Sequence, residues 1–195
     1  MDALSDIIRP FRVHLKGLEQ GRPWFSSLMD CYAVIDFSVA DATAKSGKDA
    51  ACRKGCNFCC YHKIPLSTAE LMGLKLYVSH VLDAEAKNFL AENLKKGGDL
   101  CLFNRDGVCT VYPVRPVACR RYVVLGESCL KEELPVVTRP QDALKPSGRL
   151  FALAAELTLP FYDVMRIPRM QGESPLDFYK RQNVFLSSVY SVVLE

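Results

Sequence analysis

The first part of the chain carries apolar residues at intervals of three or four, a spacing typical of helices that pack on one face. Residues 3–18 follow this pattern but include Pro10, so we expect a helix that is interrupted there. A longer helix is predicted from Pro23 to about Ala44. Its apolar face consists of Trp24, Leu28, Cys31, Ile35 and Val39. Because Cys31 lies on this face, far in sequence from the other cysteines, we interpret it as a core residue.

Two helix start signals follow in the middle of the chain. Ser67 and Glu70 form a capping box, which predicts a helix to about residue 80. Asp83 is expected to cap a second helix, which ends near the glycines at 97 and 98. The stretch before these helices, 45–64, is polar and dense in cysteine. The sequence therefore predicts an irregular segment followed by two helices.

Turn residues and prolines dominate the region after this pair of helices. The turn from Asn104 to Gly107 is flanked by apolar residues and predicts a short β-hairpin. Pro116 is a favourable first residue for a short helix that carries Cys119. Residues 124–147 hold three prolines and are expected to be irregular.

The C-terminal part returns to helical spacing. A helix is predicted over about 148–167 with a break at Pro160, and a last helix from Ser174 to about Val193. The expected fold is therefore mainly α: a small helical domain with an irregular, cysteine-rich metal-binding centre and a short β-hairpin.

Length and composition suit a single ordinary domain. The chain has 195 residues, of which 49% are hydrophobic, enough for a buried core without covalent or metal cross-links. We expect one domain over 1–195, with a cysteine-cluster metal-binding core at 50–130 between helical segments at 1–45 and 140–195.

Charge and targeting signals narrow the classes of protein. The net charge of +3 is too small to predict a nucleic-acid binder. The N-terminus has no continuous apolar core, and no stretch approaches the roughly 18 apolar residues of a membrane span. We therefore expect a cytoplasmic protein with no membrane partner. In a reducing compartment, closely spaced cysteines indicate metal or redox chemistry more often than disulfides.

Eight of the nine cysteines fall into two groups. The first group is Cys52, Cys56, Cys59 and Cys60, and the second is Cys101, Cys109, Cys119 and Cys129. Soft thiolates favour zinc or iron, the latter including a [4Fe–4S] cluster, over magnesium or calcium. An apolar core role does not suit the first group, because polar and basic residues surround it. We therefore predict that the eight cysteines bind zinc or iron.

Eight thiolates exceed the coordination number of one four-coordinate ion. Either the chain holds two centres or some thiols are spare. Cys59 and Cys60 are adjacent, so their side chains are expected to diverge, which favours two centres or a cluster over one mononuclear site. The hairpin is expected to bring Cys101 and Cys109 together, and Cys119 is expected to close that site.

Basic residues lie close to the cysteines in sequence. They are Arg53, Lys54, Arg115, Arg120 and Arg121. These cations either offset the negative charge of metal–thiolate centres and hold the thiolates deprotonated, or form a solvated basic surface. His62 follows the first cysteine group closely enough to be a further ligand.

Several short motifs occur together around the cysteines. They are Cys52-x3-Cys56-x2-Cys59-Cys60, Cys101-Leu-Phe, Gly107-x-Cys109-x-x-Tyr112, Arg115-Pro116 and Cys119-Arg120-x-Tyr122. This combination, over about residues 50–130, resembles the YkgJ-like cysteine-cluster family of zinc- or iron-chelating domains. The resemblance implies that the eight cysteines form the chelating site, and it assigns no biochemical role.

Three other functions stay open. Flagellin lysine N-methylases look similar in cysteine pattern, and Cys52-x3-Cys56-x2-Cys59 matches the spacing of radical S-adenosylmethionine enzymes. Either would make the chain an iron–sulfur enzyme that uses S-adenosylmethionine, although it lacks a glycine-rich cofactor loop and is short for both. The second alternative is a zinc-dependent module that binds protein or nucleic acid. The third is a redox switch at Cys59 and Cys60.

Overall fold

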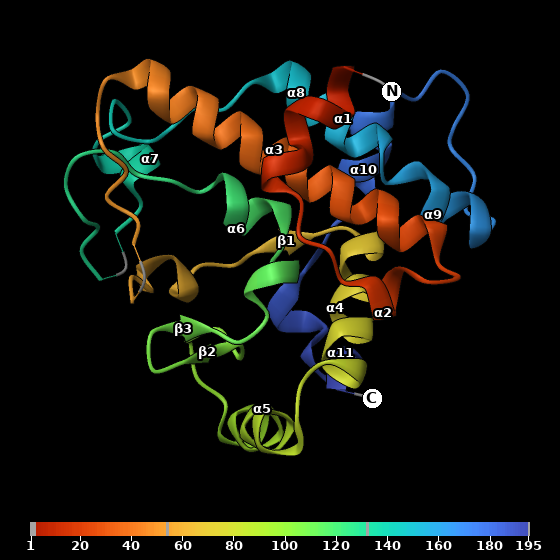
Figure 1. Cartoon of the computed structure of the whole chain (residues 1–195). Helices are drawn as coiled ribbons and strands as arrows, with labels where there is room; N and C mark the ends of the chain where they lie inside the picture. Colours follow the sequence, from red (N-terminus) through yellow and green to blue (C-terminus); the bar gives the residue numbers. More distant parts are fainter. Residues whose placement is uncertain (1–2, 54, 132, 195) are drawn as a thin grey trace.

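The structure is a computed structural model that describes residues 3–53, 55–131 and 133–194 (Figure 1). It is mainly helical, as the spacing of apolar residues predicts. The helices are α1 (Ala3–Ile8), α2 (Lys16–Glu19), α3 (Pro23–Ser46), α4 (Thr68–His80), α5 (Ala84–Lys96), α6 (Val117–Arg121), α7 (Pro135–Thr138), α8 (Gly148–Glu156), α9 (Leu159–Val164), α10 (Pro175–Arg181) and α11 (Tyr190–Leu194). Short 3-10 turns are η1 (Arg9–Phe11), η2 (Phe58–Tyr61), η3 (Tyr112–Val114) and η4 (Leu186–Ser188). The strands pair antiparallel, β1 (Pro65–Leu66) with β4 (Val184–Phe185) and β2 (Asn104–Arg105) with β3 (Val108–Cys109).

Helix α3 runs across the molecule and contacts α1, α4, α6, α8 and α9 (Figure 1). Pro23 opens it at the first position, and Gly47 follows it in the left-handed region at φ 66°. The predicted helix from Pro23 is therefore confirmed, and it ends at Ser46 rather than at about residue 44. Cys31 is 1% exposed, which confirms it as a core residue.

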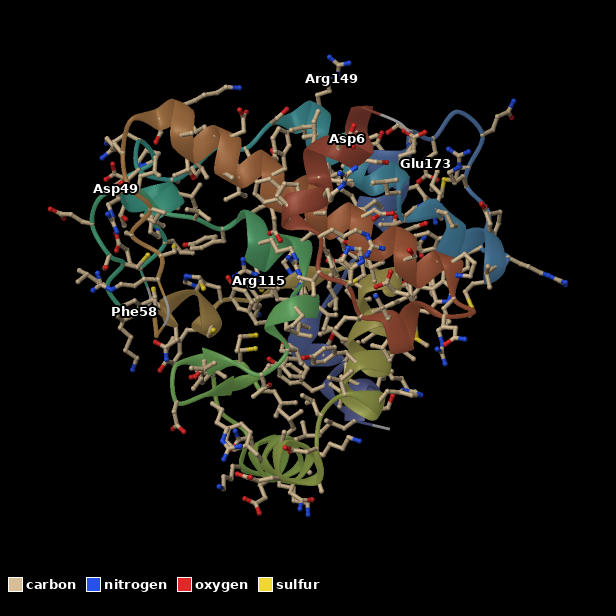
Figure 2. All side chains as sticks on the ribbon, in the orientation of Figure 1. Asp6, Asp49, Phe58, Arg115, Arg149 and Glu173 are labelled. Atoms are coloured by element: carbon tan, nitrogen blue, oxygen red, sulfur yellow. The ribbon has the colours of Figure 1, made fainter. Side chains whose placement is uncertain are left out.

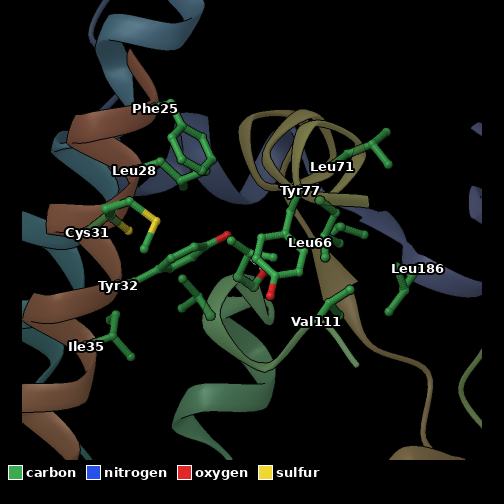
Figure 3. Close-up of a cluster of buried hydrophobic side chains, with 14 of the residues drawn as sticks. Phe25, Leu28, Cys31, Tyr32, Ile35, Leu66, Leu71, Tyr77, Val111 and Leu186 are labelled. Atoms are coloured by element: carbon green, nitrogen blue, oxygen red, sulfur yellow. Dashed lines mark hydrogen bonds between the residues drawn. The ribbon is translucent and has the colours of Figure 1, made fainter. Parts of the chain in front are cut away.

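The main core forms where α3 packs against α4 and the segments around them. Figure 3 shows the α3 side chains Phe25, Leu28 and Tyr32 in one cluster with buried residues from other elements, such as Leu66. Gly73 lets α4 approach α3 closely, because a Cβ there would lie 2.6 Å from Leu28 Cδ2. Each large apolar side chain buried in this cluster contributes roughly 1.5–3 kcal/mol, so the core is the main source of stability.

The N-terminal segment breaks at Pro10, as predicted. Helix α1 ends at Ile8, a 3-10 turn contains Pro10, and the chain continues without helix to Leu15. The Arg12 guanidinium fastens this segment by bonding Glu19 at 2.8 Å and Asp30 of α3. The segment is therefore held on α3 by a partly buried ion pair as well as by apolar contacts.

Both middle helices begin at the predicted caps. Ser67 Oγ accepts a bond from the Glu70 N–H, and the Glu70 carboxylate accepts one from the Ser67 N–H at 2.7 Å. Asp83 caps α5 by accepting a bond from the Ala86 N–H at 2.8 Å. Helix α5 ends before Gly97, which has φ 64°. Both helices therefore have the boundaries that the sequence predicts.

The Glu70 carboxylate is fully buried and does more than cap α4. Its Oε1 accepts a bond from the Val117 N–H at the start of α6, at 2.7 Å. Its Oε2 accepts a bond from the Tyr179 hydroxyl of α10, also at 2.7 Å. One carboxylate therefore joins the beginnings of α4 and α6 to α10.

Strands β2 and β3 form the predicted hairpin, with Asn104 opposite Cys109. The two turn residues, Asp106 and Gly107, both have positive φ, at 53° and 80°, which suits a tight two-residue hairpin loop. Asn104 Oδ1 accepts a bond from the Gly107 N–H at 3.1 Å and so steadies the turn from inside.

The predicted helix over about 148–167 is present as two helices, α8 and α9. The break falls at Leu157 and Thr158, just before Pro160 rather than at it. Pro160 lies in the first turn of α9, where its missing N–H has no intrahelical partner to lose. The proline therefore starts the second helix.

The last predicted helix, from Ser174 to about Val193, is wrong beyond Arg181. Val184 and Phe185 form β4 against β1, and the Leu186 N–H donates to the Ile64 carbonyl at 2.8 Å. The local sequence allows both structures, and pairing with a distant strand decides between them. Helix then resumes as α11.

Within the three described ranges, no helix is both long enough and apolar enough to cross a membrane.

The three bonds to the Glu70 carboxylate predict a large effect of a small change. Glu70→Gln replaces one acceptor oxygen with an amide that faces a buried N–H or O–H donor. We expect this to lower the free energy of unfolding by about 1–3 kcal/mol. Urea denaturation followed by circular dichroism measures it. The control is Glu92→Gln, a residue exposed on α5, with a change below about 0.5 kcal/mol. Equal midpoints for the two variants would show that the carboxylate does not join these helices.

Candidate metal centre

The eight clustered cysteines lie in loops and short elements in the left half of Figure 1. Cys52 and Cys56 lie in the loop after α3, Cys59 and Cys60 on η2, Cys101 just before β2, Cys109 on β3, Cys119 on α6 and Cys129 in the loop before α7. All nine cysteines of the chain are free thiols. The fold therefore gathers cysteines from both sequence groups on one side of the molecule.

Backbone contacts hold the hairpin against η2. The Cys101 N–H donates to the Cys60 carbonyl at 2.8 Å, and the Asn104 side-chain amide donates to Cys60 Sγ at 3.5 Å. At the turn, a Cβ on Gly107 would lie 3.2 Å from the Gly55 carbonyl oxygen. Gly55 itself has φ 89°, the positive φ that a tight cysteine loop favours. The two cysteine-bearing segments are therefore packed directly on each other.

Four thiols, from η2, the segment before β2, β3 and α6, form the first set. Burial raises the pKa of Cys119, and the charges of Cys101, Cys109 and Cys60 raise it further. Burial also raises the pKa of Cys109 to about 11, again with contributions from Cys101 and Cys60. The pKa values of Cys109 and Cys119 therefore respond to the same two thiols, those of Cys60 and Cys101. We call Cys60, Cys101, Cys109 and Cys119 the inner set.

A second spatial set lies towards the surface. The loop that carries Cys52 and Cys56 is held by the Ala51 N–H, which donates to the Val124 carbonyl at 2.8 Å. Val124 begins the stretch that leads to Cys129. Burial raises the pKa of Cys129, and the charges of Cys52 and Cys56 raise it further. Cys52 is exposed, whereas Cys129 is buried. We group Cys52, Cys56 and Cys129 as the second set, because the Ala51–Val124 bond holds their two segments together.

Cys59 and Cys60 lie where the two sets meet. A hydrogen bond between their thiols, together with burial, raises the pKa of Cys59, and the same bond lowers the pKa of Cys60 to about 7. The two adjacent thiols therefore influence each other as well as other cysteines. The charges of Cys119 and Cys52 also raise the pKa of Cys59, so one neighbour comes from each set.

Arg115 is a cation that acts on both sets. Its charge lowers the pKa values of Cys52, Cys109 and Cys119. The guanidinium stacks on the Tyr112 ring at 4.1 Å, and its Nε is buried without a hydrogen-bond partner. Figure 2 shows it near the middle of the molecule. Arg115 therefore fits the expected role of a cation that offsets thiolate charge.

Tyr122 places a second buried donor without a partner beside the thiols. Burial raises its pKa to about 12, with further contributions from Cys129, Cys59 and Cys52. Its ring lies 5.8 Å from that of His62, whose Nε2 contacts the Glu133 carbonyl at 3.0 Å. One nitrogen of His62 is thus engaged by the backbone.

Arg120 fits neither role expected for the basic residues. It is 3% exposed and pairs with Asp36 of α3. Its Nε donates to the Arg115 carbonyl at 3.0 Å, and its Nη2 donates to the Pro113 carbonyl at 2.6 Å. The guanidinium also lies 4.2 Å from the Tyr32 ring. Arg120 therefore fastens α6 to α3.

The other basic residues near the cysteines divide between packing and surface. Arg121 lies over the Phe151 ring of α8 at 3.9 Å, which is a packing contact away from the thiols. Arg53 is exposed, as a solvated surface residue would be. Lys54 lies outside the described residues.

The chemistry of the donor set fits zinc or iron. The eight cysteines carry soft, free thiols, and two buried donors, Arg115 Nε and the Tyr122 hydroxyl, have no acceptor. Thiols that lose their protons on binding a metal become thiolates, and these would accept hydrogen bonds from the two donors. Among the described residues, however, no three His, Cys, Asp or Glu side chains are close enough together to hold a metal ion. A metal would therefore have to draw the thiols closer together than they lie here.

Three side chains that contact the cysteines were missed by the sequence analysis as parts of the site. Asn104 bonds Cys60, Tyr122 lies near Cys129, and the Tyr190 hydroxyl bonds the Cys101 thiol and accepts a bond from the Leu102 N–H at 3.2 Å. Asn104 and Tyr122 lie inside the hairpin and the last cysteine motif, which is a usable signal. Tyr190 comes from α11, near the other end of the chain, and no local pattern indicates it.

Comparison with known proteins agrees with the donor chemistry. Residues 51–138 match the CxxCxxCC family, described as a putative zinc- or iron-chelating domain. Searches of curated proteins and of solved structures found no match. The matched range contains all eight clustered cysteines and confirms the resemblance to a cysteine-cluster family. Residues 51–138 are therefore similar to the CxxCxxCC family, which is described as a putative zinc- or iron-chelating domain.

Proposed function

We propose that this protein holds zinc or iron through eight cysteine thiolates and that the bound metal cross-links distant parts of the chain. The proposed ligands are Cys52, Cys56, Cys59, Cys60, Cys101, Cys109, Cys119 and Cys129. The observation that supports this most is the contact between two cysteine-bearing segments that α4 and α5 separate in sequence, since the Cys101 N–H donates to the Cys60 carbonyl at 2.8 Å. A closed set of four thiolates is the usual structural zinc site and equally suits a [4Fe–4S] cluster.

The local structure around the thiols supports a structural role for the metal. Six of the eight cysteines lie outside helices and strands or on a single 3-10 turn, where few repetitive hydrogen bonds hold the backbone. Metal–thiolate bonds would replace those missing constraints, and their free energy would add directly to that of folding. A reducing compartment such as the cytoplasm would keep the thiols available for metal.

Metal content tests this function. Protein purified without oxygen should contain zinc or iron by elemental analysis, colourless for zinc and brown for an iron–sulfur cluster. The variant Cys52→Ala with Cys56→Ala should lose at least part of the metal, because both residues are proposed ligands. The control Cys31→Ala removes the core thiol of α3 and should keep the full content. Metal-free wild-type protein, with stability equal to that of the double variant, would contradict the proposal.

Arg115 provides a prediction about affinity. Arg115→Gln removes the charge that acts on thiols of both sets, and it should weaken Zn²⁺ binding about 10–100-fold. Competition with a chromophoric chelator measures the affinity. The matched control is Arg149→Gln on α8, which removes the same charge far from the cysteines (Figure 2). Equal affinities for the two variants would show that Arg115 does not compensate thiolate charge.

A further inference from the structure

An open cavity lies between α6 and the segment that leads into α8. Its volume is about 330 Å³, which is within the range of small-ligand sites. Six residues line it: Ala118, Arg121, Tyr122, Leu144, Lys145 and Pro146. No proposed metal ligand is among these six, so the cavity is a different feature of the molecule from the cysteine site.

Helix α6 and a backbone bond set the shape of this cavity. Ala118 and Arg121 are three residues apart on α6, so their side chains lie on one face of that helix. Just after α6, the Val123 carbonyl accepts a bond from the Leu144 N–H at 2.9 Å. This bond holds the opposite wall in place. The cavity is therefore formed in advance, which lowers the cost of ordering it around a ligand.

The Arg121 guanidinium is a partly buried charge without a counter-charge. Its Nε is buried with no hydrogen-bond partner, and the side chain forms no hydrogen bond or ion pair with any described residue. It lies 3.9 Å from the Phe151 ring, and burial lowers its pKa. A guanidinium nevertheless stays charged in proteins, and an unpaired charge that is partly removed from water is costly. An anion in the cavity would offset that cost.

Lys145 adds a second cation to the lining, and it too has no ion pair within the part of the chain that the structure describes. Two carboxylates lie close by: Asp41 lines the adjoining cavity together with Lys145, and Asp142 is three residues away in sequence. Each is already paired, Asp41 with Lys45 at 2.7 Å and Asp142 with Lys48 at 2.9 Å. The two cations of the cavity are therefore left for a ligand.

We propose that this cavity binds a small organic phosphate monoester, with the phosphate on Arg121 and Lys145 and the organic group against Ala118, Leu144 and Pro146. Two cations match the charge of about −1.5 to −2 that a phosphate monoester carries at pH 7. A guanidinium can bond two phosphate oxygens at once, and a lysine binds phosphate as a point charge. This inference does not rest on the proposed metal site.

Binding of phenyl phosphate tests the cavity directly. Calorimetric titration of the protein as purified, at low salt and about pH 7.5, should show one site per chain with a Kd at or below about 1 mM. Benzoate and benzyl alcohol, which carry one and no negative charge, should bind at least about tenfold more weakly. No binding of phenyl phosphate at 10 mM, or equally tight binding of either analogue, would overturn the proposal.

Matched variants assign the binding to this cavity. Arg121→Gln should weaken phenyl phosphate binding about 10–100-fold, because it removes a charged donor that is partly buried. Lys145→Gln should weaken it only about 2–5-fold, because Lys145 is exposed. The control Arg169→Gln removes a charge from the loop between α9 and α10, opposite α7 in Figure 1, and should bind as wild type does.

Circular dichroism checks that each variant is folded. If Arg121→Gln does not fold, the exposed Lys145→Gln carries the comparison with the control. Affinities equal to that of Arg169→Gln in every folded cavity variant would show that phenyl phosphate binds elsewhere, and would overturn the assignment.

Discussion

The buried carboxylate of Glu70 is the constraint on which the arrangement of this molecule most depends. It is fully buried, and its two oxygens accept bonds from Ser67, Val117 and Tyr179, each at 2.7 Å. A buried carboxylate is tolerated only when donors surround it, so these three partners and their helices have to stay together. Because Val117 begins α6, the same carboxylate positions the helix that carries Cys119.

A second buried charge completes that anchorage. Arg120 follows Cys119 directly and binds Asp36 of α3 as well as the Pro113 and Arg115 carbonyls. The cysteine region is thus attached to the helical core through buried polar bonds as well as apolar contacts. Arg120 therefore lies beside a cysteine in sequence but stabilises the packing of α6 on α3 rather than a metal site.

The elements with local signals could be predicted from the sequence. The capping box at Ser67, the cap at Asp83 and the turn residues before Val108 each act within a few residues. The two helices have the predicted boundaries, and the hairpin is present with a tighter turn than the predicted Asn104–Gly107. The last helix could not be predicted, because Val184 and Phe185 are paired by a strand more than a hundred residues away. The intrinsic preference of a short segment for helix or strand does not indicate a pairing partner that is distant in sequence.

The candidate site shows the same division between local and distant information. The cysteine spacing and the family resemblance indicate the eight thiols and the chemistry of zinc or iron. They do not indicate that Cys60 packs with the hairpin or that Tyr190 reaches Cys101, because both depend on how α11 and η2 pack. The sequence positions of Arg115 and Arg120 also do not indicate that Arg115 acts on the thiols whereas Arg120 binds Asp36 of α3.

X-ray absorption at the zinc or iron edge tests most directly whether cysteine thiolates hold the metal. On protein purified without oxygen, the first shell should consist of sulfur alone, at about 2.3 Å for zinc. A first shell of nitrogen and oxygen atoms would contradict the thiolate centre described above.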